Sequence, residues 1–158
     1  GEGIEIGVTR IGVHSGEAVV GNFGSSRKME FTALGDTVNA ASRTEGVNKY
    51  FGTRMCVTDD VVRNCLNLDV LLRPIGSIVL KGKVKPLILY EPLPKAEGSA
   101  ELLKRYMLAY GKVEQGHDSA KPELEALLAD NPNDGLVKFH LDRIHRGLIS
   151  ADVHMEDK

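Results

Sequence analysis

The fold is decided by one stretch near the start of the chain, FTALGDTVNAASRTEGVNKYFG, at residues 31–52. From Gly35 onward, its apolar positions recur with the three- and four-residue spacing of a helix that buries one side. Asp36 is placed to cap this helix, and Gly52 is placed to end it. The stretch therefore predicts a helix over 36–51. The apolar residues on or near its predicted stripe are Val38, Ala41, Val47 and Phe51.

The residues before this helix have the pattern of β-structure. Apolar and polar residues alternate over 4–13, which predicts a half-buried strand. A turn at Gly16 and a second β-like run over 18–20 predict a hairpin. The segment 21–26, rich in Gly, Asn and Ser, predicts a flexible loop after it.

Further short elements are predicted after the helix. Residues 55–57 are typical of a short buried strand, and the acidic residues that follow favour a second short helix over 59–65. Two β-like runs, 69–74 and 75–80, are followed by a basic turn and a strand over 87–90. This last part predicts another hairpin.

Composition limits the possible functions. The chain has 158 residues, 42% hydrophobic and 27% charged, enough for one core and at most a small second unit. Its net charge of −2 gives no basic field to attract nucleic acid or an anionic membrane, so we expect neither partner. No apolar run is long enough to span a bilayer. Cys56 and Cys65 lack metal-ligand spacing, and we expect free thiols, as in a cytoplasmic protein.

A linker divides the chain. Prolines and small polar residues at 94–99 separate a β-rich part, 1–93, from a part at 100–158 whose apolar residues recur at helical spacing. The second part is predicted to be a helical extension that resembles a TPR-like helical hairpin with one extra helix, without a recurring period. The chain begins at Gly1 on a strand-like segment, so we expect it to derive from a longer protein.

Two polar residues of the predicted helix could act together on one ligand. Asn39 and Arg43 are four residues apart and therefore project from one face, one turn apart. An Asn amide can orient a hydroxyl, and the planar Arg guanidinium matches phosphate oxygens. Taken alone, the pair also fits a solvated Asn and an Arg in a surface ion pair, which is the commoner case on an arbitrary helix.

Three motifs change that interpretation: RIGVHSGEAVVGNFG at 10–24, FTALGDTVNAASR at 31–43, and VLKGK at 79–83 followed by Leu89-Tyr90. In this order they closely resemble the class III adenylate/guanylate cyclase catalytic domain. The resemblance implies an α+β, ferredoxin-like nucleotidyl cyclase fold, a βαββαβ sheet covered on one face by helices. About the C-terminal half of that fold is expected here.

The resemblance also implies a reaction, in which ATP or GTP cyclises as its 3′-hydroxyl attacks the α-phosphate and pyrophosphate leaves. Asn39 then corresponds to the residue that orients the ribose, and Arg43 to the residue that stabilises charge at the α-phosphate. Lys81 corresponds to the ligand of the terminal phosphate. Without the surrounding motif, Lys81 would be an ordinary charged residue of a hairpin turn.

Base selection is expected at Thr32, seven residues before Asn39. Many adenylate cyclases of the family place there an Asp that accepts a hydrogen bond from the adenine amino group, and a Thr hydroxyl can accept the same bond. Thr at this position is similar to a mostly bacterial subgroup of adenylate cyclases, so we expect ATP rather than GTP. A strand-end Thr favoured by β propensity and a guanylate cyclase stay open as alternatives.

Cofactors and partners are implied in the same way. The family uses two divalent cations, Mg or Mn, held by two Asp residues that precede the segment found here, and no Asp precedes Asp36 in this chain. We therefore assign no metal ligand and expect the chain alone to be inactive. The expected partners are ATP and a second copy, because the family works as dimers with the site at the interface. The parent protein is expected in the cytoplasm, with or without a membrane anchor.

The alternative from another class is a degenerate cyclase-like module that binds a nucleotide or only a protein partner. Asn39, Arg43 and Lys81 favour the enzyme, because a module has no chemical reason to keep all three.

Overall fold

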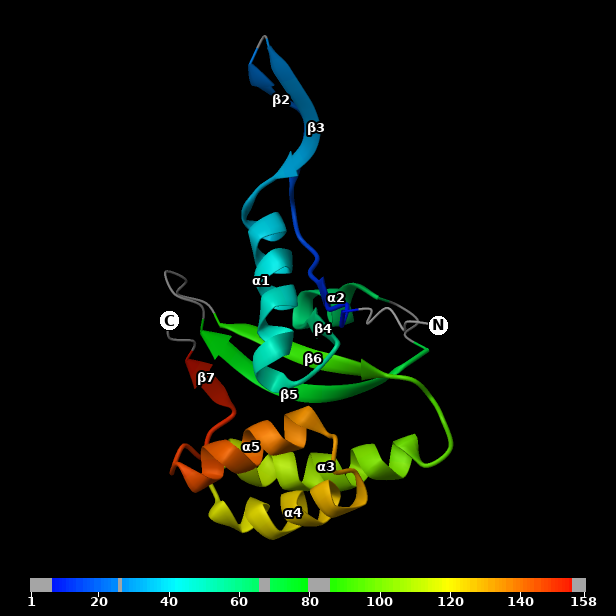
Figure 1. The fold of residues 1–158 in the computed structure, drawn as a ribbon, viewed down its shortest axis with the longest axis vertical. Coiled ribbons are helices and arrows are strands. Elements are labelled where there is room, and N and C mark those ends of the chain that lie inside the picture. Colours follow the sequence, from blue (N-terminus) through cyan, green and yellow to red (C-terminus); the bar gives the residue numbers. More distant parts are fainter. Residues whose placement is uncertain (1–6, 26, 66–68, 80–85, 155–158) are drawn as a thin grey trace, which may run out of the picture.

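The computed structural model describes residues 7–25, 27–65, 69–79 and 86–154 of the chain, which form an α+β fold (Figure 1). Its strands are β1 (Ile11–Val13), β2 (Val19–Ser25), β3 (Lys28–Leu34), β4 (Met55–Thr58), β5 (Leu71–Val79), β6 (Leu87–Leu93) and β7 (Asp152–His154). Its helices are α1 (Asp36–Phe51), α2 (Asp59–Asn64), α3 (Ser99–Glu114), α4 (Lys121–Asp130) and α5 (Gly135–His145), with a 3₁₀ turn at Asp118–Ala120.

Within the described ranges, five strands form one sheet in the order β1-β4-β6-β5-β7. The pairs β1–β4 and β5–β7 are parallel, whereas β6 pairs antiparallel with both β4 and β5. The predicted runs 69–74 and 75–80 are one strand, β5, with a register shift between Pro74 and Gly76. A proline has no N–H for the ladder, and the shift accommodates it.

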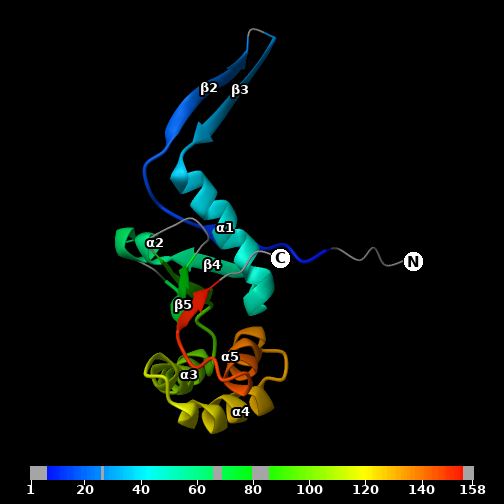
Figure 2. The same cartoon turned by 90° about the vertical axis from the view of Figure 1, so that its left-hand side faces the viewer.

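The predicted hairpin between 4–13 and 18–20 is wrong. β1 pairs with β4, with Ile11 opposite Met55, so its ladder hydrogen bonds are made to a strand beyond α1. The hairpin is instead β2–β3, which pairs from Val19 opposite Leu34 to Ser25 opposite Lys28. The described part of the predicted loop 21–26 is therefore strand. Both ribbon views show this hairpin extending away from the sheet (Figures 1 and 2).

The helix α1 runs over the predicted residues and ends at Gly52, which has a left-handed φ of 67°. Its N-cap is Gly35 rather than Asp36, which is the first helical residue and still places a negative charge in the first turn. The buried residues are Thr44, Val47, Asn48 and Phe51, all in the second half of the helix. Val38 of the predicted stripe is 39% exposed, because the first half rises past the sheet toward the hairpin.

The helices α3, α4 and α5 stack below β5 and share its core (Figure 2). One cluster of buried residues joins Phe51 of α1, Ile75 and Ile78 of β5, and Tyr106 and Leu141 of the helical part. After α5 the chain returns to the sheet as β7, a strand that the sequence did not predict. None of the described helices has the length and apolar character needed to cross a membrane.

Candidate active site

Asn39 and Arg43 lie on the exposed side of α1, one turn apart. Residues at this spacing have Cβ atoms about 5–6 Å apart, so one ligand can reach both side chains. Neither side chain has a hydrogen bond or ion pair with another residue of the described ranges. The amide and the guanidinium are therefore available to a ligand approaching from outside the described chain.

A close backbone contact fixes α1 on the sheet. Gly12 of β1 lies directly under the middle of the helix, where an added Cβ would be 2.1 Å from the Glu45 backbone nitrogen. Only glycine permits this approach, because a side chain would meet backbone atoms that cannot move aside. Asn48 adds a hydrogen bond between the two elements, since its Nδ2 donates to the backbone oxygen of Ile11 at 3.0 Å. The depth of α1 on β1 is therefore set by Gly12 and Asn48.

The amide oxygen of Asn48 is satisfied on its other side. It accepts hydrogen bonds from the Thr53 hydroxyl at 2.8 Å and from the Cys56 thiol at 3.1 Å. Burial raises the pKa of the Cys56 thiol to about 11, so the thiol stays protonated and can donate. Cys56 is thus a structural donor rather than a nucleophile, and both cysteines are free, as expected from the sequence.

The first turn of α1 is tied to the segment between β1 and β2. The Thr37 hydroxyl donates to the backbone oxygen of Glu17 at 2.6 Å. Gly16 lies against the same side chain, where an added Cβ would be 2.7 Å from Thr37 Oγ1. Next to it, a His14 ring nitrogen lies 2.9 Å from the Thr58 hydroxyl, which joins this segment to the start of α2. These contacts hold the base of the hairpin beside the helix that carries Asn39.

Thr32 lies near the base of the hairpin, on β3, four residues before α1. Its cross-strand partner is Gly21, so no side chain faces it across the ladder. Thr32 is exposed, and its hydroxyl has no hydrogen-bond partner among the residues described. Thr32 on β3 and Asn39 in the first turn of α1 have no hydrogen bond between them, and Figure 1 shows β3 leading directly into the start of α1.

Two expectations fall on other parts of the chain. Lys81 lies outside the described residues. In the described ranges, no group of three or more His, Cys, Asp or Glu side chains could hold a metal ion. These residues therefore do not fit the divalent cations on which cyclases of the resembled class generally depend, and we derive no step through a metal.

The comparison with known families settles what kind of domain this is. The family described as the adenylate and guanylate cyclase catalytic domain matches residues 3–91, which is more than half of the chain. The chain belongs to this cyclase family. The match includes α1 and the hairpin, so the cyclase domain supplies the surface that displays Thr32, Asn39 and Arg43.

Two of the relatives of this cyclase domain are adenylate cyclases from bacteria. The chain is 46% identical over 83 residues to adenylate cyclase 1 of Rhizobium meliloti, and 39% identical over 83 residues to an adenylate cyclase of Anabaena cylindrica. These matches cover 52% and 51% of this chain, but only 12% and 16% of the two relatives. The chain thus spans a small part of the curated relatives' length.

Among solved structures, the adenylyl cyclase CyaB from P. aeruginosa is 25% identical, with a TM-score of 0.43 over 54% of this chain and 42% of that one.

Sequence reasoning missed the residues that support this cyclase surface. Gly12 and Gly16 were assigned only to strand and turn patterns, and Asn48 received no role. A signal was present for Asn48, because it stands beside Val47 on the buried side of α1, where an unpaired amide would be unfavourable. No local signal marks Gly12, since its partner Glu45 lies on another element.

Proposed function

We propose that the protein containing this chain is an adenylate cyclase, which converts ATP to 3′,5′-cyclic AMP and pyrophosphate. The 3′-hydroxyl oxygen of the ribose forms a bond to the α-phosphorus and loses its proton. The bond from the α-phosphorus to the bridging oxygen of the β-phosphate breaks, and pyrophosphate leaves with that oxygen. In this proposal residues 1–93 supply catalytic-domain residues, 94–99 the connection and 100–158 a helical extension.

The observation that carries the proposal is the pair Asn39 and Arg43, both exposed and unpaired within the described chain, on one face of α1 in a cyclase domain. Asn39 orients the ribose so that its 3′-oxygen faces the α-phosphorus. Arg43 donates to the α-phosphate oxygens, where negative charge builds up in the transition state. Arg43 is exposed and makes no ion pair with a residue of the described ranges, which leaves its donors free for this role.

The remaining site residues complete substrate binding. Thr32 accepts a hydrogen bond from the adenine amino group, and Lys81 binds the terminal phosphate. Two divalent cations, Mg or Mn, belong to the proposal through the family, with ligands outside the described residues. The reaction consumes ATP, and we place it in the cytoplasm.

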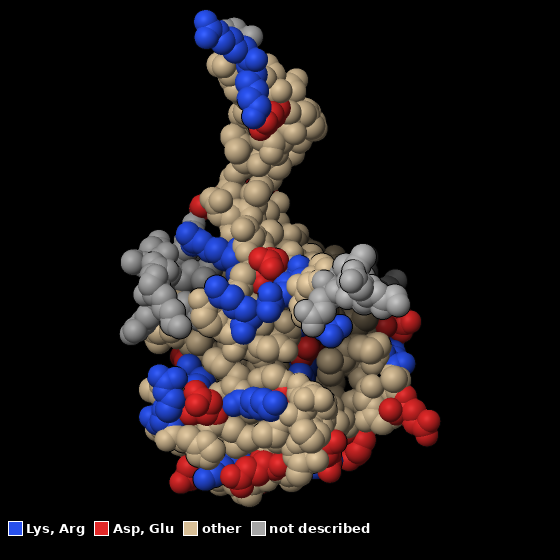
Figure 3. All heavy atoms as spheres, viewed as in Figure 1, with Lys and Arg blue, Asp and Glu red and all other residues tan. Residues whose placement is uncertain are grey.

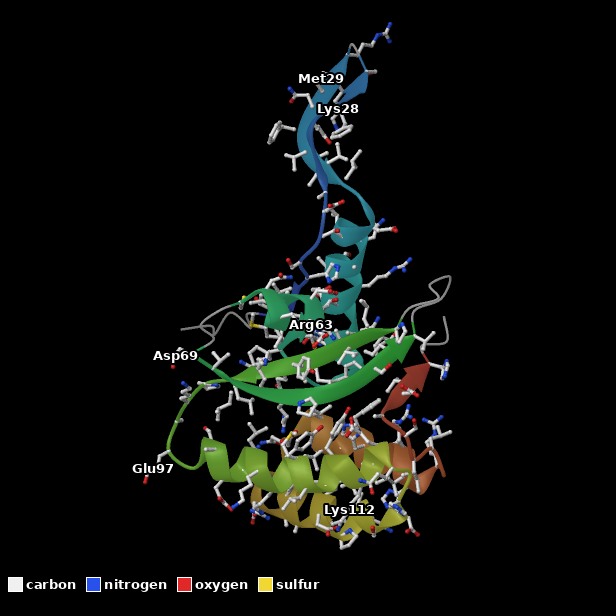
Figure 4. All side chains as sticks on the ribbon, turned by 180° about the vertical axis from the view of Figure 1, so that it is seen from behind. Lys28, Met29, Arg63, Asp69, Glu97 and Lys112 are labelled. Atoms are coloured by element: carbon white, nitrogen blue, oxygen red, sulfur yellow. The ribbon has the colours of Figure 1, made fainter. Side chains whose placement is uncertain are left out.

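A second copy of the chain is the proposed partner at the active site. The register of the hairpin puts Val20, Met29 and Phe31 on one face, and their exposed fractions are 60%, 60% and 74%. Figure 3 shows Lys and Arg at the hairpin tip and a mostly uncharged surface below it. Figure 4 shows Met29 at that end, far from the sheet. Such an apolar surface is typical of a protein interface, and a second copy would cover it.

The test is cyclic AMP formation by the full-length protein with ATP and a divalent cation. Arg43→Ala is expected to lower kcat about 10²- to 10³-fold with little change in KM, because it removes a transition-state contact. Lys49→Ala is the control, since Lys49 is an exposed cation on the same helix whose amine lies over the Tyr50 ring and makes no ion pair with a residue of the described ranges. No cyclic AMP from the unaltered protein, or equal effects of both variants, would contradict the proposal.

A further inference from the structure

The first residues of α5 are held by a buried ion pair with β5. Asp134 is the N-cap of α5, and its Oδ1 accepts from the Val137 backbone N–H at 3.1 Å. The same carboxylate accepts two hydrogen bonds from Arg73, from Nη1 to Oδ2 at 2.5 Å and from Nη2 to Oδ1 at 3.1 Å. Both side chains are almost fully buried, with exposed fractions of 6% and 5%. This planar two-point pair fixes the direction of α5 as well as its distance from the sheet.

Arg73 is itself held by the sheet and by α3. Its Nε donates to Glu91 of β6 at 2.9 Å, and its guanidinium lies 5.1 Å from the centre of the Tyr106 ring. Burial alone would lower the pKa of Arg73, but Asp134 and Glu91 raise it above its ordinary value, so Arg73 stays charged. The next residue, Pro74, accepts a hydrogen bond from the Tyr106 hydroxyl at 2.8 Å. One point on β5 therefore anchors both α3 and α5.

The residue after Asp134 contacts the end of α1 directly. A Cβ added to Gly135 would be 2.6 Å from the Gly52 Cα, and a Cβ added to Gly52 would be 2.7 Å from the Gly135 Cα. The two backbones thus meet with no side chain between them. Real Cβ atoms do not approach backbone atoms so closely, so any side chain at Gly135 must push α5 and α1 apart.

A ring contact continues this interface along α5. Phe51, the last residue of α1, meets Phe139 edge to face with ring centres 4.7 Å apart. Phe51 is completely buried. The end of α1 therefore packs against α5 at two places, the backbone contact between Gly52 and Gly135 and the ring contact between Phe51 and Phe139.

We propose that Asp134 and Gly135 are positioning residues that set the placement of α1, and thereby of Asn39 and Arg43, from the helical part of the chain. Because α1 is continuous, Arg43 lies about 13 Å along the helix axis from Gly52. A shift at the end of α1 is carried to Arg43, and a misplacement of about 1 Å can reduce turnover about 100-fold. Any partner or signal that alters the docking of α3–α5 thus alters the site. The catalytic consequence rests on the proposed cyclase function.

The main variant is Gly135→Ala in the full-length protein, with Gly111→Ala as the matched control. Gly111 lies within α3, and an added Cβ there meets nothing within 4 Å. Both changes add one methyl group to a helix, but only the first one pushes on α1. We expect Gly135→Ala to lower kcat about 10-fold or more with KM for ATP changed less than about threefold, and Gly111→Ala to leave both values within about twofold.

A second measurement does not depend on catalysis. Hydrogen–deuterium exchange of backbone amides in α1, over residues 44–51, is expected to rise in Gly135→Ala and to be unchanged in Gly111→Ala. If exchange rises but the unaltered protein makes no cyclic AMP, the positioning contact stands and the proposed function fails. If exchange in α1 is the same in both variants, or if kcat falls equally in both, the inference is overturned.

A milder change covers the case in which Gly135→Ala does not fold. Asp134→Asn keeps an oxygen that can accept from the Val137 N–H but removes the charge that faces Arg73. We expect faster exchange in α1 and a severalfold lower kcat at similar KM. Asp130→Asn, which alters the exposed pair with Arg105, is its control and should change neither. Equal behaviour of these two variants would also overturn the inference.

Discussion

Tyr106 Oη and His140 Nε2 lie 3.1 Å apart in the core between α3 and α5, where both side chains are fully buried. The Tyr106 hydroxyl donates its only proton to the backbone oxygen of Pro74. It must therefore accept from His140, which places the imidazole proton on Nε2. His140 Nδ1 is buried without a partner among the described residues. An unprotonated Nδ1 can stay unbonded at modest cost, whereas a proton on Nδ1 would find no acceptor among the described residues.

His140 should make the folded protein less stable at acidic pH. Burial, together with the positive charges of Arg143 and Arg73, lowers the pKa of His140 from 6.5 to about 3. Between these two pH values the unfolded chain binds a proton that the folded chain does not bind. The free energy of unfolding should therefore be fully retained above pH 6.5 and should fall as pH drops toward 3, by up to about 1.4 kcal/mol per pH unit.

Urea denaturation as a function of pH measures this effect. In His140→Gln the amide nitrogen can still donate to Tyr106, but it does not titrate, so the slope between pH 6.5 and 4 should become shallower. His145→Gln changes an exposed histidine on the same helix and should keep the slope. An unchanged slope in His140→Gln would assign the acid sensitivity to another group.

Arg73 should be among the residues most important for stability. Replacing it with Met keeps most of the volume but leaves the buried Asp134 and the partly buried Glu91 without a cation, which should lower the free energy of unfolding by about 3–5 kcal/mol. Arg105→Met removes an exposed pair with Asp130 and should lower it by less than about 1 kcal/mol. Thermal and chemical denaturation compare the two, and similar losses would show that burial of the Arg73 cluster contributes little.

Thr32 should influence base choice. If its hydroxyl accepts from the adenine amino group, Thr32→Ala should lower the ratio of kcat/KM for ATP over GTP about fivefold, the equivalent of about 1 kcal/mol. Thr32→Asp should keep or sharpen the preference, because a carboxylate also accepts from adenine and repels the guanine carbonyl. The assay uses both nucleotides with the full-length protein. A ratio that Thr32→Ala leaves unchanged would place base selection elsewhere.

The apolar face of the hairpin should support dimerisation. Phe31 is 74% exposed, so Phe31→Ser should leave thermal stability of a monomer unchanged while weakening the dimer about 10-fold or more in sedimentation experiments. Leu108→Ser alters a residue of α3 that is 65% exposed and serves as the control. Equal dimer affinity in the two variants would exclude the hairpin face from the interface.

Local features of the sequence were sufficient for the helix that carries the candidate site. The spacing of apolar positions after Gly35 and the stop at Gly52 fixed α1 within its observed bounds. Because the α-helical period is local, Asn39 and Arg43 had to share one face whatever the rest of the chain did. The motifs around them were also sufficient to indicate the cyclase family, which the family comparison confirms.

The partners of strands could not be obtained in this way. The alternation in β1 is compatible with pairing to any strand, and the nearest one, β2, was the wrong choice. Tertiary structure selects β4 because Gly12 lets α1 pack on β1, and this packing places β4 beside it. β2 is then left to pair with β3 and to form the projecting hairpin.

The contacts that place the site also depend on residues far apart in the chain. Gly52 and Gly135, or Arg73 and Asp134, carry no mutual signal in the sequence, since each is locally an ordinary helix end, strand residue or cap. Only the packed structure brings the members of each pair together, because burial of one continuous core draws α5 against both β5 and the end of α1. The sequence alone thus determined that Asn39 and Arg43 share one face of α1, because helical periodicity is local, whereas long-range packing decided what holds that helix in place.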